Sequence, residues 1–94
     1  MGKWPFDEPE NVVTLTVRQV MDGRLPILLV VHDADDGTWQ FLTGGPFEIV
    51  DGMLVSLRRV YHLDPSIGEL ADLPLGWSAE RKAREQPWKR QPSR

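Results

Sequence analysis

Cysteine is absent from this chain of 94 residues, and histidine occurs only at His32 and His62. Without cysteine there is no disulfide framework, no thiolate zinc site and no cysteine nucleophile. Two histidines leave few side chains that exchange protons near neutral pH. A chain without disulfides fits a reducing compartment, and we expect a cytoplasmic protein.

Long hydrophobic runs are also missing. The longest apolar run, from Ile27 to Val31, is far too short to cross a bilayer. The first nine residues carry charges and prolines and lack the apolar core of a signal peptide. We therefore expect a soluble protein with no membrane partner.

Charge is unevenly distributed along the chain. Residues 1–80 hold five basic and thirteen acidic side chains, a net charge of −8, whereas residues 81–94 hold six basic side chains and Glu85, a net charge of +5. A basic tail on an acidic body can contact nucleic acid, an acidic partner or its own domain. A single tryptophan, Trp88, is available to stack on a base, so nucleic-acid contact through this tail is only an alternative.

The chain is long enough for a single hydrophobic core. Residues 1–10 contain two prolines and four charges, and we expect a flexible lead-in. Residues 11–84 form the single predicted domain, and residues 85–94 form a basic, loose tail.

Hydrophobic periodicity and turn residues predict an α+β fold. The sheet is expected to be mostly antiparallel, with four or five strands and two or three short helices on one face. Predicted strands cover residues 11–16, 27–32, 38–42, 53–55 and 76–81, and predicted helices cover residues 17–22, 56–62 and the turns after Asp64. Thr16 and Gln19 match a capping box, while Ser56 and Asp64 are expected to cap the later helices.

Residues 26–44 are typical of a β-hairpin whose acidic loop holds the best candidate site. His32, Asp33, Asp35 and Asp36 lie within five positions of the loop, where three carboxylates could bind a hard cation. The loop fails the EF-hand pattern, because its sixth position is not glycine and its twelfth is Gly44. Turn geometry explains the same aspartates more simply, and we assign no metal, no cofactor and no catalytic residue.

Four tryptophans divide into two pairs. Trp39 and Trp77 lie in strand patterns and are expected in the core. Trp4 and Trp88 lie in the proline-bearing termini, where they either fold back as lids or form an exposed surface suited to an interface.

Two segments carry a family resemblance. The first is residues 36–44, an acidic turn followed by Trp-x-Phe and a glycine. The second is Leu63-Asp-Pro-Ser-Ile, which continues to residues 73–81. Together they resemble a bacterial domain of unknown function that is similar to the immunity-protein-like domains of polymorphic toxin systems. The resemblance covers about residues 12–82 and implies a cytoplasmic binder that blocks a partner protein. It carries no catalytic residue over to this chain.

Besides a nucleic-acid contact through the basic tail, three classes of function remain open. The leading hypothesis is a non-enzymatic protein-binding module, of which an immunity-like protein is one form, with Asp33, Asp35, Asp36, Trp4 and Trp88 contacting another protein. The first alternative is a small metal-dependent hydrolase that uses His32 and the same carboxylates. The second is a structural subunit whose strand edge pairs with its own copy.

Overall fold

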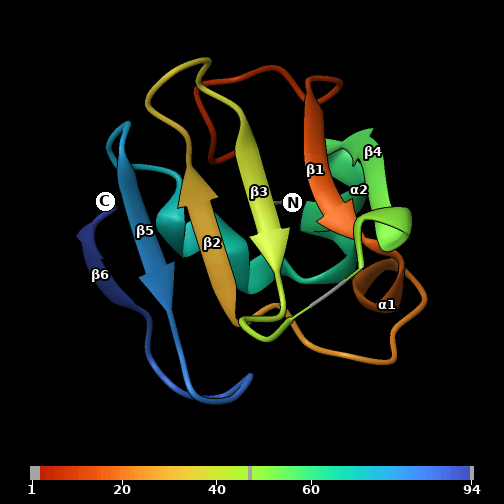
Figure 1. The fold of residues 1–94 in the computed structure, drawn as a ribbon. Helices are drawn as coiled ribbons and strands as arrows, with labels where there is room; N and C mark the ends of the chain where they lie inside the picture. Colours follow the sequence, from red (N-terminus) through yellow and green to blue (C-terminus); the bar gives the residue numbers. More distant parts are fainter. Residues whose placement is uncertain (1–2, 47, 94) are drawn as a thin grey trace.

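The computed structural model describes residues 3–46 and 48–93 as an α+β fold built on one sheet (Figure 1). Its strands are β1 (Val13–Val17), β2 (Leu29–His32), β3 (Trp39–Leu42), β4 (Gly52–Ser56), β5 (Trp77–Glu80) and β6 (Lys89–Pro92). Its helices are α1 (Arg18–Met21) and α2 (Leu57–Leu63), with short 3₁₀ helices η1 (Ile49–Asp51) and η2 (Pro65–Leu70).

The sheet is mixed and has six strands in the order β4-β1-β3-β2-β5-β6. The expectation of four or five strands was close but inexact, because β6 adds a sixth strand. Most strand pairs are antiparallel as expected, and β1 and β3 run parallel. The chain leaves β1 through α1, skips one strand position and enters β2. The β2–β3 hairpin then returns β3 into the space beside β1, which makes that one pair parallel.

The predicted hairpin of β2 and β3 is confirmed. Val30 lies opposite Phe41 of β3 on one side and opposite Ala79 of β5 on the other. All three side chains are buried, as expected of an interior strand whose two faces are apolar. Trp39 and Phe41 share the face of the sheet that packs into the core.

The core lies between the sheet and the helices α2 and η2, which run behind the sheet in Figure 1. Leu57 and Val60 of α2 and Ile67 and Leu70 of η2 are fully buried there. Ser56 caps α2 through its hydroxyl, which accepts from the Arg59 amide, and Asp64 caps η2 by accepting from the Ser66 amide. Both predicted caps are therefore confirmed.

The predicted capping box at Thr16 is wrong. The strand continues through Val17, so Thr16 lies inside β1, where its hydroxyl donates to the Phe41 carbonyl over 2.7 Å. Gln19 turns away from the helix start and donates to Asp51 over 2.8 Å. The sheet hydrogen bond replaces the local one because Thr16 is completely buried and needs an acceptor there.

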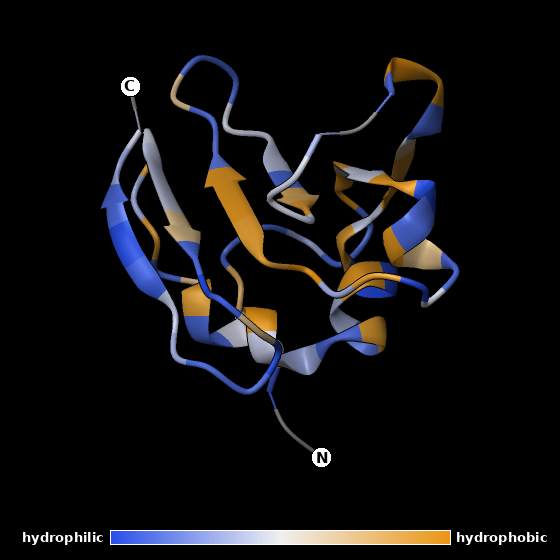
Figure 2. Ribbon diagram, turned by 60° about the horizontal axis from the view of Figure 1, so that its bottom comes forward, coloured by the Kyte–Doolittle hydropathy of each residue, from blue (hydrophilic) through white to orange (hydrophobic). Residues whose placement is uncertain are grey.

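The lead-in and the tail both take part in the fold, although the sequence suggests a flexible lead-in and a loose tail. Phe6 is buried and packs edge-on against Trp39 at 5.4 Å between ring centroids. Residues 89–92 form β6 along the outer edge of β5. Arg90 anchors β6 through Asp72 at 2.9 Å and the Glu69 carbonyl at 2.8 Å. Figure 2 shows that β6 is hydrophilic along its length. Because it lacks alternating hydrophobic residues, the sequence does not predict a strand there.

Candidate functional site

The acidic loop between β2 and β3 is organised by its own side chains. Asp33 accepts from the Asp35 amide at 2.8 Å, and Asp36 accepts from the Thr38 amide at 2.9 Å. Gly37 adopts a positive φ of 74°, which closes the loop without steric cost. Turn chemistry therefore accounts for Asp33 and Asp36, and Asp35, which lies between them in the sequence, is exposed to solvent, as is Asp36.

The charge of Asp36 is stabilised within this loop. The backbone amide and the hydroxyl of Thr38 hold the pKa of Asp36 below its usual value. The carboxylate is thus ionised at neutral pH and held by hydrogen bonds within the loop. The arrangement presents rigid negative charge at one end of the sheet.

His32 lies at the base of the loop and is held as part of the core. Its Nδ1 is 2.8 Å from the Leu73 carbonyl, and its ring stacks on Trp39 at 3.9 Å. Its Nε2 is 3.5 Å from the Glu8 carboxylate. Among residues 3–46 and 48–93, no group of three histidine, aspartate or glutamate side chains is arranged to hold a metal ion. His32 and the three aspartates are neighbours in the sequence, but their side chains do not form one metal-coordination sphere.

A small hollow of about 370 Å³ lies beside the loop, lined in part by His32, Asp33 and Asp35. Gly76 and Ser93 also line it, so the residue that follows β6 lies beside the loop. The Ser93 amide donates to the Gly76 carbonyl over 2.7 Å. The hollow is open, and the polar groups that line it are engaged mainly in holding the chain.

Trp4 folds back onto the body of the protein. Its ring lies 5.5 Å from Phe6 and 5.4 Å from Tyr61, and its indole nitrogen donates to the Glu8 carbonyl over 2.7 Å. Of the two arrangements that the sequence left open for this residue, the structure shows the folded-back one. Trp4 remains partly exposed at its rim.

Trp88 is likewise packed, and it covers Arg81. The Arg81 guanidinium lies 4.0 Å from the centroid of the Trp88 ring. The same guanidinium is buried and donates to the Ile27 carbonyl, the Ser66 hydroxyl, the Arg84 carbonyl and the Asp64 carboxylate at 2.9 to 3.0 Å. Sequence reasoning missed this group, because an arginine after an alternating strand resembles any exposed basic residue.

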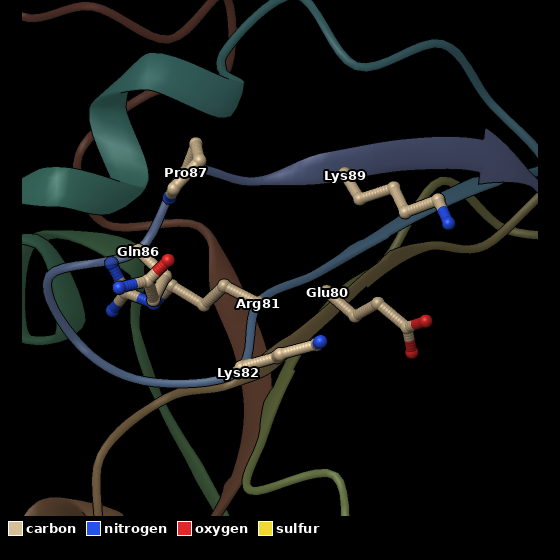
Figure 3. A pocket seen from close by; sticks show the side chains of 6 residues that line it. All are labelled: Glu80, Arg81, Lys82, Gln86, Pro87 and Lys89. Atoms are coloured by element: carbon tan, nitrogen blue, oxygen red, sulfur yellow. The ribbon is translucent and has the colours of Figure 1, made fainter.

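A hollow of about 540 Å³ lies where β5 leads into β6 (Figure 3). Lys82 and Lys89 line it, together with Glu80, Gln86 and Pro87. Arg81 extends toward Gln86 and away from Glu80, so its charge serves the buried network described above. Two of the basic side chains predicted for a nucleic-acid contact, Arg81 and Arg90, are therefore committed to contacts within the fold.

Among the large hydrophobic residues that the structure describes, the three with the highest exposed fractions lie in η1 and β4. The exposed fractions are 93% for Ile49, 81% for Val50, 74% for Leu54 and 55% for Val13 on the neighbouring β1. We call these four residues the β4 edge surface. In Figure 2 the orange turn of η1 projects from the body of the molecule. The sequence signal for this surface is the apolar pair Ile49-Val50 before the Asp51-Gly52 turn, which sequence reasoning missed.

The acidic residue beside this surface is fixed. Asp51 forms an ion pair with Arg18 and accepts from the Gln19 amide at 2.8 Å. These two partners hold the pKa of Asp51 below its usual value. The contacts tie η1 to α1 and so hold Ile49 and Val50 in their projecting position.

Comparison with known proteins gives no relative for this chain: no family model matches, and no curated protein or solved structure does either. Within the described residues, none of the helices has the length and apolar character needed to span a membrane.

Proposed function

We propose that this protein is a non-enzymatic protein-binding module whose binding surface is the β4 edge surface. The observation that carries the proposal is the high exposure of Ile49, Val50 and Leu54, which lie in the end strand β4 and in the turn directly before it. An immunity-type protein, the class that the sequence resemblance implies, is one form of such a module.

Exposed apolar side chains gathered on one rim are costly unless they are covered part of the time. Clusters of this kind mark sites of protein association, whereas isolated exposed leucines need no explanation. Here the apolar side chains are held by a fixed turn, since Asp51 is tied to Arg18 and Gln19. A rigid apolar surface loses little conformational entropy when a partner covers it.

The outer strand adds a second means of attachment. β4 is an end strand of the sheet, so its outward backbone groups can pair with a strand of another chain. Its five residues, Gly-Met-Leu-Val-Ser, carry no charge that would oppose such pairing. Apolar contact and strand addition then act at the same place.

The hydrolase alternative has less support. His32 is 8% exposed, bonded to a backbone carbonyl and stacked on Trp39, which leaves its Nε2 facing Glu8 rather than the three loop aspartates. The loop carboxylates of Asp33 and Asp36 accept from backbone amides. We retain the loop as a possible second contact for a basic partner, and its test is described in the Discussion.

The proposal is tested with a pair of matched variants. Leu54→Lys places a charge in the β4 edge surface, and Leu75→Lys places the same charge at a leucine that is 58% exposed elsewhere. Affinity capture from source-cell lysate, followed by mass spectrometry, identifies proteins bound by the wild type. Binding of the purified captured protein is then measured by calorimetry.

We expect Leu75→Lys to bind as the wild type does and Leu54→Lys to bind about tenfold more weakly or worse. Equal affinity of both variants for every captured protein would remove the β4 edge surface from the proposal. Circular dichroism of both variants serves as the control for folding, because each substitution is on an exposed side chain.

A further inference from the structure

The outer edge of β4 has a defined set of available backbone groups. The Leu57 amide donates to the Val12 carbonyl over 2.9 Å, which sets the alternation of bonds between β1 and β4. By that alternation Met53 and Val55 bond inward to β1, and the backbone groups of Gly52, Leu54 and Ser56 point outward. These three residues form the free side of the strand.

Two of the six outward groups are already used. The Gly52 amide donates to the Ile49 carbonyl at the end of η1. The Ser56 carbonyl lies at the N-cap of α2, where it accepts the first helical hydrogen bond. Among the described residues, the Leu54 amide, the Leu54 carbonyl, the Gly52 carbonyl and the Ser56 amide remain. The edge therefore offers two donors and two acceptors.

We propose that a second copy of this chain pairs with β4 in antiparallel register about a two-fold axis at Leu54. This inference names the partner of the surface on which the proposed function rests. In this register Leu54 of each chain exchanges both bonds with Leu54 of the other, and each Ser56 amide donates to the opposite Gly52 carbonyl. All four available groups of each chain are satisfied. Moving the axis by one residue in either direction leaves only two bonds.

Charge at the two ends of β4 supports the same arrangement. Exposed Glu48 precedes the strand, and exposed Arg58 and Arg59 follow it. Antiparallel pairing brings the acidic end of one strand beside the basic end of the other. The arrangement is also favourable for the apolar side chains, since the two Leu54 side chains lie side by side on the same face.

The opposite end of the sheet is protected from such pairing. β6 carries Lys89, Arg90 and Pro92, and charged residues and proline are common means of blocking an exposed strand. Only the β4 end combines an uncharged strand with exposed apolar side chains. Self-association through β4 therefore closes at two copies, with the β6 ends outermost.

Cysteine cross-linking tests the register directly, because the natural chain contains no cysteine. Opposite residues of a hydrogen-bonded antiparallel pair have Cα atoms about 5.5 Å apart, within the range of a disulfide. Under mild oxidation we expect Leu54→Cys to yield mostly a disulfide-linked dimer. Leu75→Cys, the matched control at another exposed leucine, is expected to remain mostly monomeric. Equal cross-linking of the two variants would overturn the proposal.

Sedimentation velocity across a concentration series measures the association itself. We expect the wild type to approach twice the chain mass of 10.7 kDa, and Leu54→Lys to raise the dimer Kd about tenfold or more. Glu48→Arg and Arg59→Glu are each expected to weaken association about two- to fivefold, and the double variant to restore it. A double variant no better than either single one would exclude the antiparallel register.

The outcomes separate this inference from the proposed function. A wild type that stays at the mass of one chain at every concentration, with no Leu54→Cys cross-link, overturns self-pairing. The capture comparison of Leu54→Lys with Leu75→Lys then still decides the proposed function, because it detects a partner other than a second copy.

Discussion

At the scale of single residues, the buried polar group around Arg81 lies away from the loop aspartates that the sequence singles out as the candidate site. Arg81 follows β5 and looks like the start of a basic tail, yet its side chain is 2% exposed and joins η2 to the strands. Its position could not be read from local pattern, because its partners Asp64 and Ser66 are distant in the sequence and are brought near by the fold.

Replacement of Arg81 tests this network. Arg81→Met keeps most of the side-chain volume and leaves Asp64, which is 13% exposed, without its ionic partner. We expect a loss of about 3 kcal/mol in the free energy of unfolding, measured by urea denaturation. Arg58→Met is the control, because Arg58 forms an exposed pair with Glu10 at 4.0 Å, and it should cost less than about 1 kcal/mol. Similar losses for the two variants would contradict a special role for Arg81.

The ion pair of Asp51 predicts a pH dependence. Its pKa is lowered in the folded state by Gln19 and Arg18, so the contribution of its carboxylate is present above the unfolded pKa of about 3.9 and is lost as the pH falls toward the folded pKa. The melting temperature of the wild type should therefore fall more steeply than that of Asp51→Asn below about pH 5. Parallel curves measured by circular dichroism would show that Asp51 does not contribute.

At the scale of elements, the sequence predicted what short-range chemistry decides. Three predicted features depend on neighbouring residues, and all three are present. They are the β2–β3 hairpin, the Ser56 cap of α2 and the start of η2 at Asp64-Pro65. β6 was not predicted, because its four residues are exposed and polar and form a strand only by pairing with β5. The parallel pairing of β1 with β3 likewise depends on a contact between distant segments.

Hydrogen exchange tests whether the tail is a strand. Arg90→Gln removes the contacts of β6 with Asp72 and with the Glu69 carbonyl. We expect faster exchange of the amides that bond β5 to β6, with little change in the β2–β3 hairpin. Unprotected amides along β6 in the wild type would show that residues 89–92 behave as a loose tail.

The acidic loop is an element whose charge can be removed without changing its geometry. Asparagine keeps the oxygens that accept from the Asp35 and Thr38 amides, so the triple substitution of Asp33, Asp35 and Asp36 by Asn should fold as the wild type does. If the loop contacts a basic partner, the triple variant should bind that partner several-fold more weakly by calorimetry. Unchanged affinity would remove the loop from the binding surface.

At the scale of the whole molecule, the α+β class followed from periodicity, but the surface that we propose to be functional did not. Charge and tryptophan positions predicted a contact surface at the acidic loop and the termini. In the structure, Trp4 and Trp88 pack against the body of the protein. Exposure depends on which strand ends the sheet, and strand order is a property of the whole fold. The structure places the uncharged β4 at the end of the sheet, and the proposed binding surface depends on that position.

Amide exchange at Leu54 and Ser56 tests most directly the claim that β4 is a binding surface. It is measured by NMR over a range of protein concentrations and with any captured partner added. Both amides point away from β1, so they should exchange rapidly in the isolated chain and become protected when a strand covers β4. Protection that rises with protein concentration or with partner, and is lost in Leu54→Lys, is the result that we predict. Rapid exchange of both amides under every one of these conditions would contradict a binding surface at β4.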